Sequence, residues 1–177
     1  MALFTIEHLA TQKRIFEGKI INLRVDTLAH PHGLTTEREI VEHKGGAVIA
    51  ALPSAGSIIL VKQYRYSVDE ELIELPAGRI ESGEEPLAAA RRELREETGY
   101  RAFHWQELAR FYSAPGFCTE LLHLWQATEL EFVGKRLDED EATDVMVLAL
   151  DEAWNLVVNG KVRDAKTVAA LGLLSTR

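Results

Sequence analysis

Three glutamates with helical spacing are the residues of this sequence best suited to chemistry. Glu93, Glu96 and Glu97 lie in residues 86–98, a predicted helix that begins with Pro86 and stops before Gly99. At about 100° per residue, their carboxylates share roughly one third of the helix circumference. Like charges four residues apart destabilise an isolated helix by about 0.2–0.5 kcal/mol, so something must offset them. Two interpretations stay open: a solvated face neutralised by Arg92 and water, or a divalent cation held by carboxylate oxygens.

The spacing around this helix favours the cation. Gly78 is followed after five residues by Glu84, and after seven more by the run Arg92-Glu93-Leu94-Arg95-Glu96-Glu97-Thr98-Gly99-Tyr100. Residues 78–100 resemble the Nudix box: Gly, five residues, Glu, seven residues, Arg-Glu-apolar-any-Glu-Glu-any-Gly-apolar. Every fixed position matches. Tyr100 stands where an aliphatic residue is usual, and its ring fills the same apolar role.

The resemblance implies a metal centre. Glu93 and Glu97 are then direct ligands of Mg²⁺, with Mn²⁺ as the alternative ion, and Glu96 binds a second ion and takes part in catalysis. The backbone carbonyl of Ala77 completes the set, and Glu84 orients Arg92 or a metal-bound water. Gly78 and Gly99 are expected as backbone necessities, where a side chain would obstruct a turn.

A general base is sought outside the box. The acidic run Asp138-Glu139-Asp140-Glu141 precedes a predicted strand at residues 145–149, and such a run is often an ordinary solvated loop. In ADP-ribose pyrophosphatases an acidic loop at this place supplies the water-activating glutamate and a further metal ligand. By this resemblance we assign Glu139 as base and Glu141 as ligand, and the two roles could be exchanged.

Residues beyond the box resemble the same subgroup. Pro115 lies sixteen residues after Gly99, and Pro115-Gly116 predicts a tight turn that brings backbone close to a ligand. The resemblance makes Arg65 a diphosphate contact, places Glu74 in the substrate site and directs Glu120 to a ribose hydroxyl. Surface ion pairs remain the alternative for Arg65 and Glu120. Four aromatic residues could stack on the base: Phe16, Tyr64, Tyr66 and Phe117.

The implied function is Mg²⁺-dependent hydrolysis of the diphosphate bond of ADP-ribose to AMP and ribose 5-phosphate. Hydrolysis of other nucleoside diphosphate sugars, such as GDP-mannose, is the main alternative, and cleavage of oxidised nucleoside triphosphates is a weaker one. A noncatalytic nucleotide-sugar sensor is disfavoured because the box glutamates are kept and no basic helical appendage is present.

The elements that would position these residues are mixed strands and helices. Strands are expected at residues 19–28, 35–43, 72–75, 108–112, 123–127 and 145–149, with a turn at 30–33 and helices at 86–98, 151–159 and 164–174. Residues 47–52 and 58–63 are predicted to form a hairpin with one buried face. The strands and helices lack a regular βαβ rhythm, which favours an α/β (α+β) chain. The resemblance specifies an α/β/α sandwich with a mixed sheet and an N-terminal antiparallel β segment.

Composition sets the remaining bounds. The chain of 177 residues has a formal net charge of −8, which argues against binding nucleic acid and calls for a cation between protein and phosphate. It has one cysteine, Cys118, no signal peptide and no membrane-spanning apolar run, so a cytoplasmic location is expected. We predict a single domain, residues 1–177, with the catalytic core at 46–177. The resemblance adds a homodimer that involves residues 1–45.

Overall fold

The computed structural model describes residues 3–135 and 143–175 and divides into two compact units. The first unit comprises Met1–Gly45 and Tyr112–Leu121, and the second comprises Gly46–Phe111 and Leu122–Arg177. Residues 112–121 therefore join the N-terminal segment, an association that the sequence patterns did not indicate.

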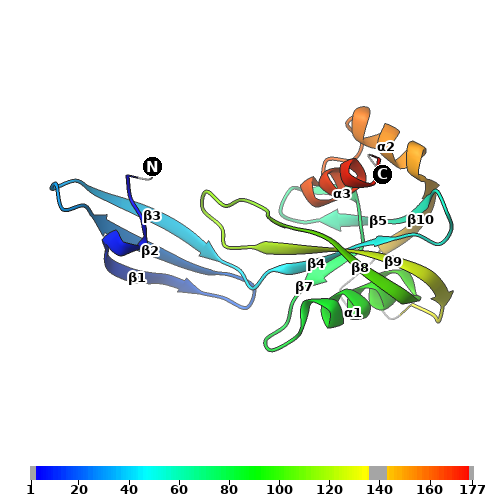
Figure 1. Ribbon diagram of the computed structural model, residues 1–177, viewed down its shortest axis with the longest axis horizontal. Coiled ribbons are helices and arrows are strands. Elements are labelled where there is room, and N and C mark those ends of the chain that lie inside the picture. Colours follow the sequence, from blue (N-terminus) through cyan, green and yellow to red (C-terminus); the bar gives the residue numbers. More distant parts are fainter. Residues whose placement is uncertain (1–2, 136–142, 176–177) are drawn as a thin grey trace. The chain divides into compact units, whose positions relative to one another are not determined.

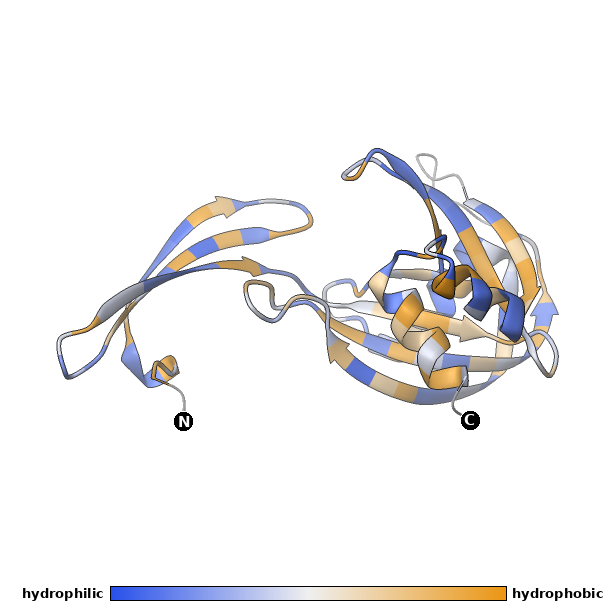
Figure 2. Ribbon diagram, turned by 90° about the horizontal axis from the view of Figure 1, so that it is seen from above, coloured by the Kyte–Doolittle hydropathy of each residue, from blue (hydrophilic) through white to orange (hydrophobic). Residues whose placement is uncertain are grey.

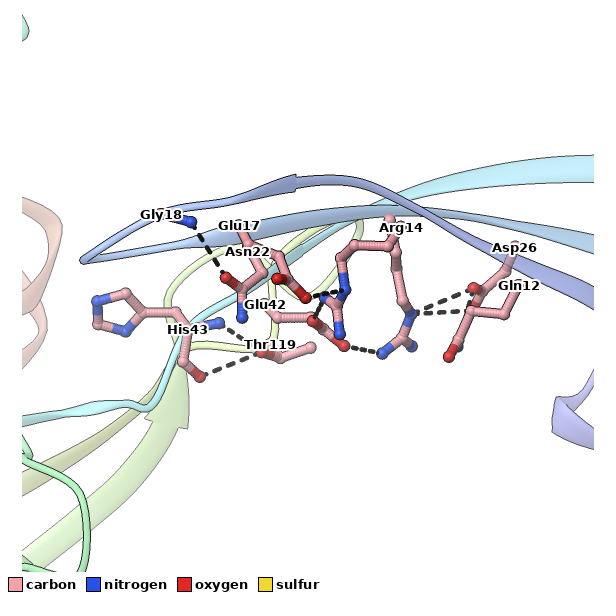
Figure 3. Close-up of polar contacts among 10 residues, drawn as sticks. Gln12, Arg14, Glu17, Gly18, Asn22, Asp26, Glu42, His43 and Thr119 are labelled. Carbon is pink, nitrogen blue, oxygen red and sulfur yellow. Dashed lines mark hydrogen bonds and ion pairs between the residues drawn. The ribbon is translucent and has the colours of Figure 1, made fainter.

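The first unit is built on an antiparallel sheet of three strands, β1 (Leu9–Glu17), β2 (Asn22–Ala29) and β3 (Thr35–Glu42), preceded by the short 3-10 helix η1 (Ile6–His8). Figure 2 shows hydrophilic and hydrophobic stretches interspersed along these strands. Arg14 of β1 donates a hydrogen bond to Glu42 of β3 (Figure 3). Directly after β3, the Thr119 hydroxyl accepts the backbone N–H of His43 and donates to its carbonyl. Among the described residues of this unit, only Asp26 and Gly45 are buried.

The second unit has two sheets between helices. One sheet has the order β10-β5-β6 and the other the order β7-β4-β9-β8. The helix α1 lies on one side of the sheets, and α2 and α3 lie on the other (Figure 1). The bounds of the strands and helices are β4 (Gly46–Ala51), β5 (Ser57–Arg65), β6 (Glu70–Glu74), β7 (Ala77–Arg79), α1 (Pro86–Thr98), β8 (Tyr100–Tyr112), β9 (Leu121–Phe132), β10 (Thr143–Ala149), α2 (Leu150–Val158) and α3 (Ala165–Ser175).

The strand β4 is the centre of this arrangement. It pairs antiparallel with β7 and parallel with β9, so the sheet is mixed, and all six of its residues are buried. Val48 and Ala50 belong to the apolar cluster that includes residues of α2 and α3. Ala47 and Ile49 belong to the cluster that includes residues of α1. The unit is thus an α/β/α sandwich, and α1 is held by a core under its apolar stripe.

One expectation about these strands was wrong. Residues 47–52 and 58–63 do not form a hairpin, because β4 and β5 belong to different sheets. The physical reason is that β4 and the apolar part of β5 are buried on two faces. A strand covered on both faces appears in the sequence as a continuous apolar run, and such a run does not show which strand it pairs with. The helix predicted at 86–98 is confirmed with both ends, since Pro86 begins α1 and Gly99 ends it in the left-handed conformation, with φ of 78°.

Candidate metal centre

The acidic face of α1 is not a solvated surface. Glu93 and Glu97 are only 9% and 2% exposed, while Leu94 on the neighbouring stripe is fully buried in the core beneath the helix. Burying a carboxylate is costly unless it is hydrogen-bonded or paired with a cation. Water alone therefore does not neutralise these two residues, whereas the neutralisation by Arg92 that the first interpretation named is present at Glu93 and Glu96.

Both buried carboxylates lie against the same dipeptide of β7. The backbone N–H of Ala77 donates to Oε2 of Glu97 at 3.0 Å. A Cβ added to Gly78 would stand 1.9 Å from Oε1 of Glu93, so only a glycine lets that carboxylate come so close to the backbone. The structure thus brings Glu93, Glu97, Ala77 and Gly78 together, and a side chain at Gly78 would collide with the Glu93 carboxylate and not, as the sequence had suggested, with a turn.

Arg92 connects the remaining box glutamates. Its Nη1 donates to Glu93 Oε1 at 2.6 Å and to Glu96 Oε2 at 3.0 Å. Its Nε and Nη2 donate to the two carboxylate oxygens of Glu84, each at 3.0 Å, and Nη2 also donates to the carbonyl of Arg79. Hydrogen bonding from Arg92 lowers the pKa of Glu84, and the same bonds raise the pKa of Arg92. Of the two partners predicted for Glu84, Arg92 or a metal-bound water, the structure shows the contact with Arg92.

The donor chemistry of this cluster fits a hard divalent cation, because carboxylate and carbonyl oxygens are the ligands that Mg²⁺ and Mn²⁺ prefer. Among residues 3–135 and 143–175, however, no three acidic, histidine or cysteine side chains stand close enough to ligate one ion by themselves. Carbonyl oxygens, water and ligand phosphates would have to complete the shell. The two predicted contributors from the acidic run, Glu139 and Glu141, lie outside the described residues.

A second charged cluster lies around Glu74, at the end of β6. This carboxylate is 2% exposed. It accepts hydrogen bonds from Nε and Nη2 of Arg65 at 2.7 and 2.8 Å and from Nζ of Lys166. Burial opposes the ionisation of Glu74, but the hydrogen bonds and charges of Arg65 and Lys166 outweigh it, so the pKa is lowered. Arg65 itself is 37% exposed, so one edge of its guanidinium is fixed on Glu74 while the side chain keeps access to solvent.

The run Asp164-Ala165-Lys166-Thr167 also resembles the ADP-ribose pyrophosphatase subgroup in sequence, but that resemblance gave no role to Lys166 or Thr167. Asp164 caps the N-terminus of α3: its Oδ2 accepts the backbone N–H of Thr167 at 3.0 Å and the Thr167 hydroxyl at 2.5 Å. The available signal was the spacing of an aspartate three residues before a threonine at a predicted helix start. That pattern predicts a cap, but it does not predict what the cap would contact.

The remaining predicted substrate residues lie in the first unit. Residues 114–118 form the tight turn expected at Pro115-Gly116, in which the N–H groups of Phe117 and Cys118 donate to the Ala114 carbonyl at 3.1 and 2.9 Å. Glu120 stands 3.3 Å from Nδ1 of His43. The turn is confirmed, and the roles of Pro115, Gly116 and Glu120 toward a ligand stay predictions.

Comparisons with known proteins agree with this geometry. Residues 42–171 match the family model of the NUDIX domain. An ADP-ribose pyrophosphatase of Bacillus subtilis is 41% identical over 97% of this chain and 94% of its own length. A methanol dehydrogenase activator of Bacillus methanolicus is 40% identical over 92% of this chain and 89% of its own.

Two further similarities bear on substrate and fold. A GDP-mannose pyrophosphatase of Cronobacter sakazakii is 34% identical over 78% of this chain and 81% of its own length. The crystal structure of an ADP compounds hydrolase superposes with a TM-score of 0.83 over 95% of this chain and 91% of that chain, at 21% identity. At that level of identity the superposition establishes the fold.

Proposed function

Because this chain belongs to the NUDIX hydrolase family, we propose that it hydrolyses the diphosphate bond of ADP-ribose to AMP and ribose 5-phosphate. The observation that carries the proposal is the pair of buried carboxylates, Glu93 and Glu97, packed against Ala77-Gly78 at the spacing of the family motif. The ADP-ribose pyrophosphatase relative, similar over nearly the whole of both chains, supports this substrate.

NUDIX hydrolases use divalent metal cations, and we propose Mg²⁺ for this chain, with Mn²⁺ able to replace it. Glu93, Glu97 and the carbonyl of Ala77 would hold the cation, with Glu96 and Glu141 as further ligands. When bound, the cation neutralises the phosphates and lowers the pKa of a bound water. Glu139, assisted by Glu96, would take the proton of the attacking water.

We propose that Arg65 contacts the diphosphate. Glu74 holds Nε and Nη2 of Arg65 through two parallel hydrogen bonds, which fixes the plane of the guanidinium and lowers the conformational entropy lost on binding phosphate. This contact changes the expected role of Glu74. As a buried carboxylate already bonded to two cations, it would act on the substrate by orienting Arg65. Pro115, Gly116 and Glu120 keep their predicted roles as ligand contacts.

The substrate is tested by an assay of the purified protein with Mg²⁺ across ADP-ribose, GDP-mannose, NADH and deoxynucleoside triphosphates. We expect ADP-ribose to give the highest kcat/KM and to release AMP. Preference for GDP-mannose, the substrate named for one relative, would keep the reaction class and replace the substrate. In Glu97→Gln an oxygen still accepts the Ala77 N–H, so the fold should persist while kcat falls by at least about a hundredfold.

We also propose that the chain forms a homodimer through its first unit. All nine residues of β1 are exposed, including the apolar Leu9, Ile15 and Phe16, and a three-stranded sheet without a covered face is only marginally stable. Sedimentation should give about twice the chain mass of 19.8 kDa. Ile15→Glu should shift the protein toward the monomer, whereas Gln106→Glu, which adds the same charge at an exposed residue of the second unit, should not. A monomeric wild type would refute the proposal.

None of the helices in the described part of the chain is long and apolar enough to cross a bilayer. The cytoplasmic location expected from the lone Cys118 stays a proposal, which cell fractionation would test.

A further inference from the structure

The first turn of α3 reaches the strand segment that carries the candidate metal centre. The backbone N–H of Leu75 donates to the hydroxyl of Thr167 at 2.8 Å, across 92 positions of sequence, and Thr167 is fully buried. One residue earlier, Glu74 accepts from Nζ of Lys166. Lys166 is itself fixed by Asp164, with Nζ 2.9 Å from Oδ1. The α3 cap therefore holds residues 74 and 75 through one side chain and one backbone group.

The other end of the same short segment is held by α1 and β4. The carbonyl of Pro76 accepts the N–H of Ile49 at 2.9 Å, the N–H of Ala77 donates to Glu97, and Gly78 lies against Glu93. Each of the five residues 74–78 is thus in contact with a fixed neighbour. A displacement of residues 74 and 75 would have to be absorbed within three residues, and one of those three is a proline.

We propose that Thr167 and Lys166 are positioning residues for the metal centre, acting through the backbone of residues 74–78. Thr167 sets the place of the Leu75 N–H, and Lys166 sets the place of Glu74. Together they fix the position of the Ala77 carbonyl and the position of the Ala77 N–H, which donates to Glu97. The inference rests on the proposed metal-dependent function, because it concerns ligands of that site.

The residue types support positioning over a plain stability role. The Thr167 hydroxyl accepts from Leu75 and donates to Asp164, so its single donor and one of its two acceptor positions point in fixed directions. Lys166 brings a half-buried positive charge to Glu74, three residues before Ala77. Its Coulomb effect alone would repel a divalent cation, so removing Lys166 should raise metal affinity if charge were its main influence. Positioning predicts the opposite sign.

The test is a titration of the metal-free protein with Mn²⁺ in the absence of substrate. The electron paramagnetic resonance signal of free Mn²⁺ measures how much of the ion is bound. Thr167→Val and Lys166→Met should each weaken Mn²⁺ binding by about tenfold, the size of effect seen when groups behind a metal ligand are removed. Thr167→Ser keeps the hydroxyl and should stay within about twofold of the wild type. Lys161→Met removes the same charge from an exposed side chain near α3 and serves as the matched control.

Unchanged or tighter Mn²⁺ binding in folded Lys166→Met and Thr167→Val would overturn the inference, as would the absence of Mn²⁺ binding by the wild type. If Thr167→Val does not fold, Lys166→Met alone decides. A wild type that binds Mn²⁺ but cleaves no nucleotide substrate would refute the proposed function and leave the positioning role standing on the binding data.

Discussion

Gly78→Ala should separate the geometry of the metal centre from the stability of the fold. Gly78 does not need a left-handed backbone, so an alanine meets no strain of its own there. Its Cβ would, however, stand 1.9 Å from Oε1 and 2.0 Å from Cδ of Glu93. Ordinary contact begins at 3.4 Å, so the carboxylate must retreat by about 1.5 Å. The atoms that move are the flexible end of a side chain, so the fold should persist.

A displacement of this size at a reacting centre costs about a hundredfold in rate. We therefore expect kcat/KM for ADP-ribose to fall by about that factor in Gly78→Ala, with weaker Mg²⁺ activation and a melting temperature close to that of the wild type. Gly172→Ala in α3 is the control, since its added Cβ meets Trp154 at an ordinary 3.8 Å. Activity of Gly78→Ala within about threefold of the wild type would refute the assignment of Glu93 to the metal centre.

Three further outcomes are expected. Leu94→Ala leaves a cavity under α1 and should lower the free energy of unfolding by about 3 kcal/mol in urea titrations. The pKa of Glu74 is lowered from 4.5, so its ion pairs stabilise the fold above that value, and this stability is lost as the pH falls through the folded pKa. The stability difference between wild type and Glu74→Gln should therefore be largest at neutral pH and shrink in acid. Urea midpoints measured across this pH range would show it. Removal of metal with EDTA should abolish hydrolysis reversibly, and added Mg²⁺ at a hundred times its Kd should stabilise the fold by about 2.7 kcal/mol in calorimetry.

The helix α1 was the element best predicted from sequence. Pro86 and Gly99 mark its two ends by local backbone chemistry. The shared face of the three glutamates then follows from their spacing and from helix geometry alone. The strand β1 had no such signal, because every one of its residues is exposed and its apolar residues do not mark one buried face. Only the later part of that hairpin, residues 19–28, was recognised, and it begins in the structure at Asn22.

Pairing across the chain was the information that sequence patterns lacked. A continuous apolar run such as β4 shows that a strand is buried, but it does not show that its neighbour is β9 instead of β5. Glu74 illustrates the same limit at the level of one side chain. Its residue type suits a ligand contact or an ion pair equally well, and the cations Arg65 and Lys166 decide the matter only once the fold brings them to the buried Glu74 carboxylate.

The parallel pairing of β4 with β9 has a consequence for the order of folding. Gly46 pairs with Leu122, so the central strand stays without one neighbour until the ribosome has released residues well beyond 122. The N–H of Leu75 has no Thr167 hydroxyl to bond until residue 167 has emerged, which is later still. We expect the candidate metal centre to reach its final shape among the last events, when nearly the whole chain is free of the exit tunnel.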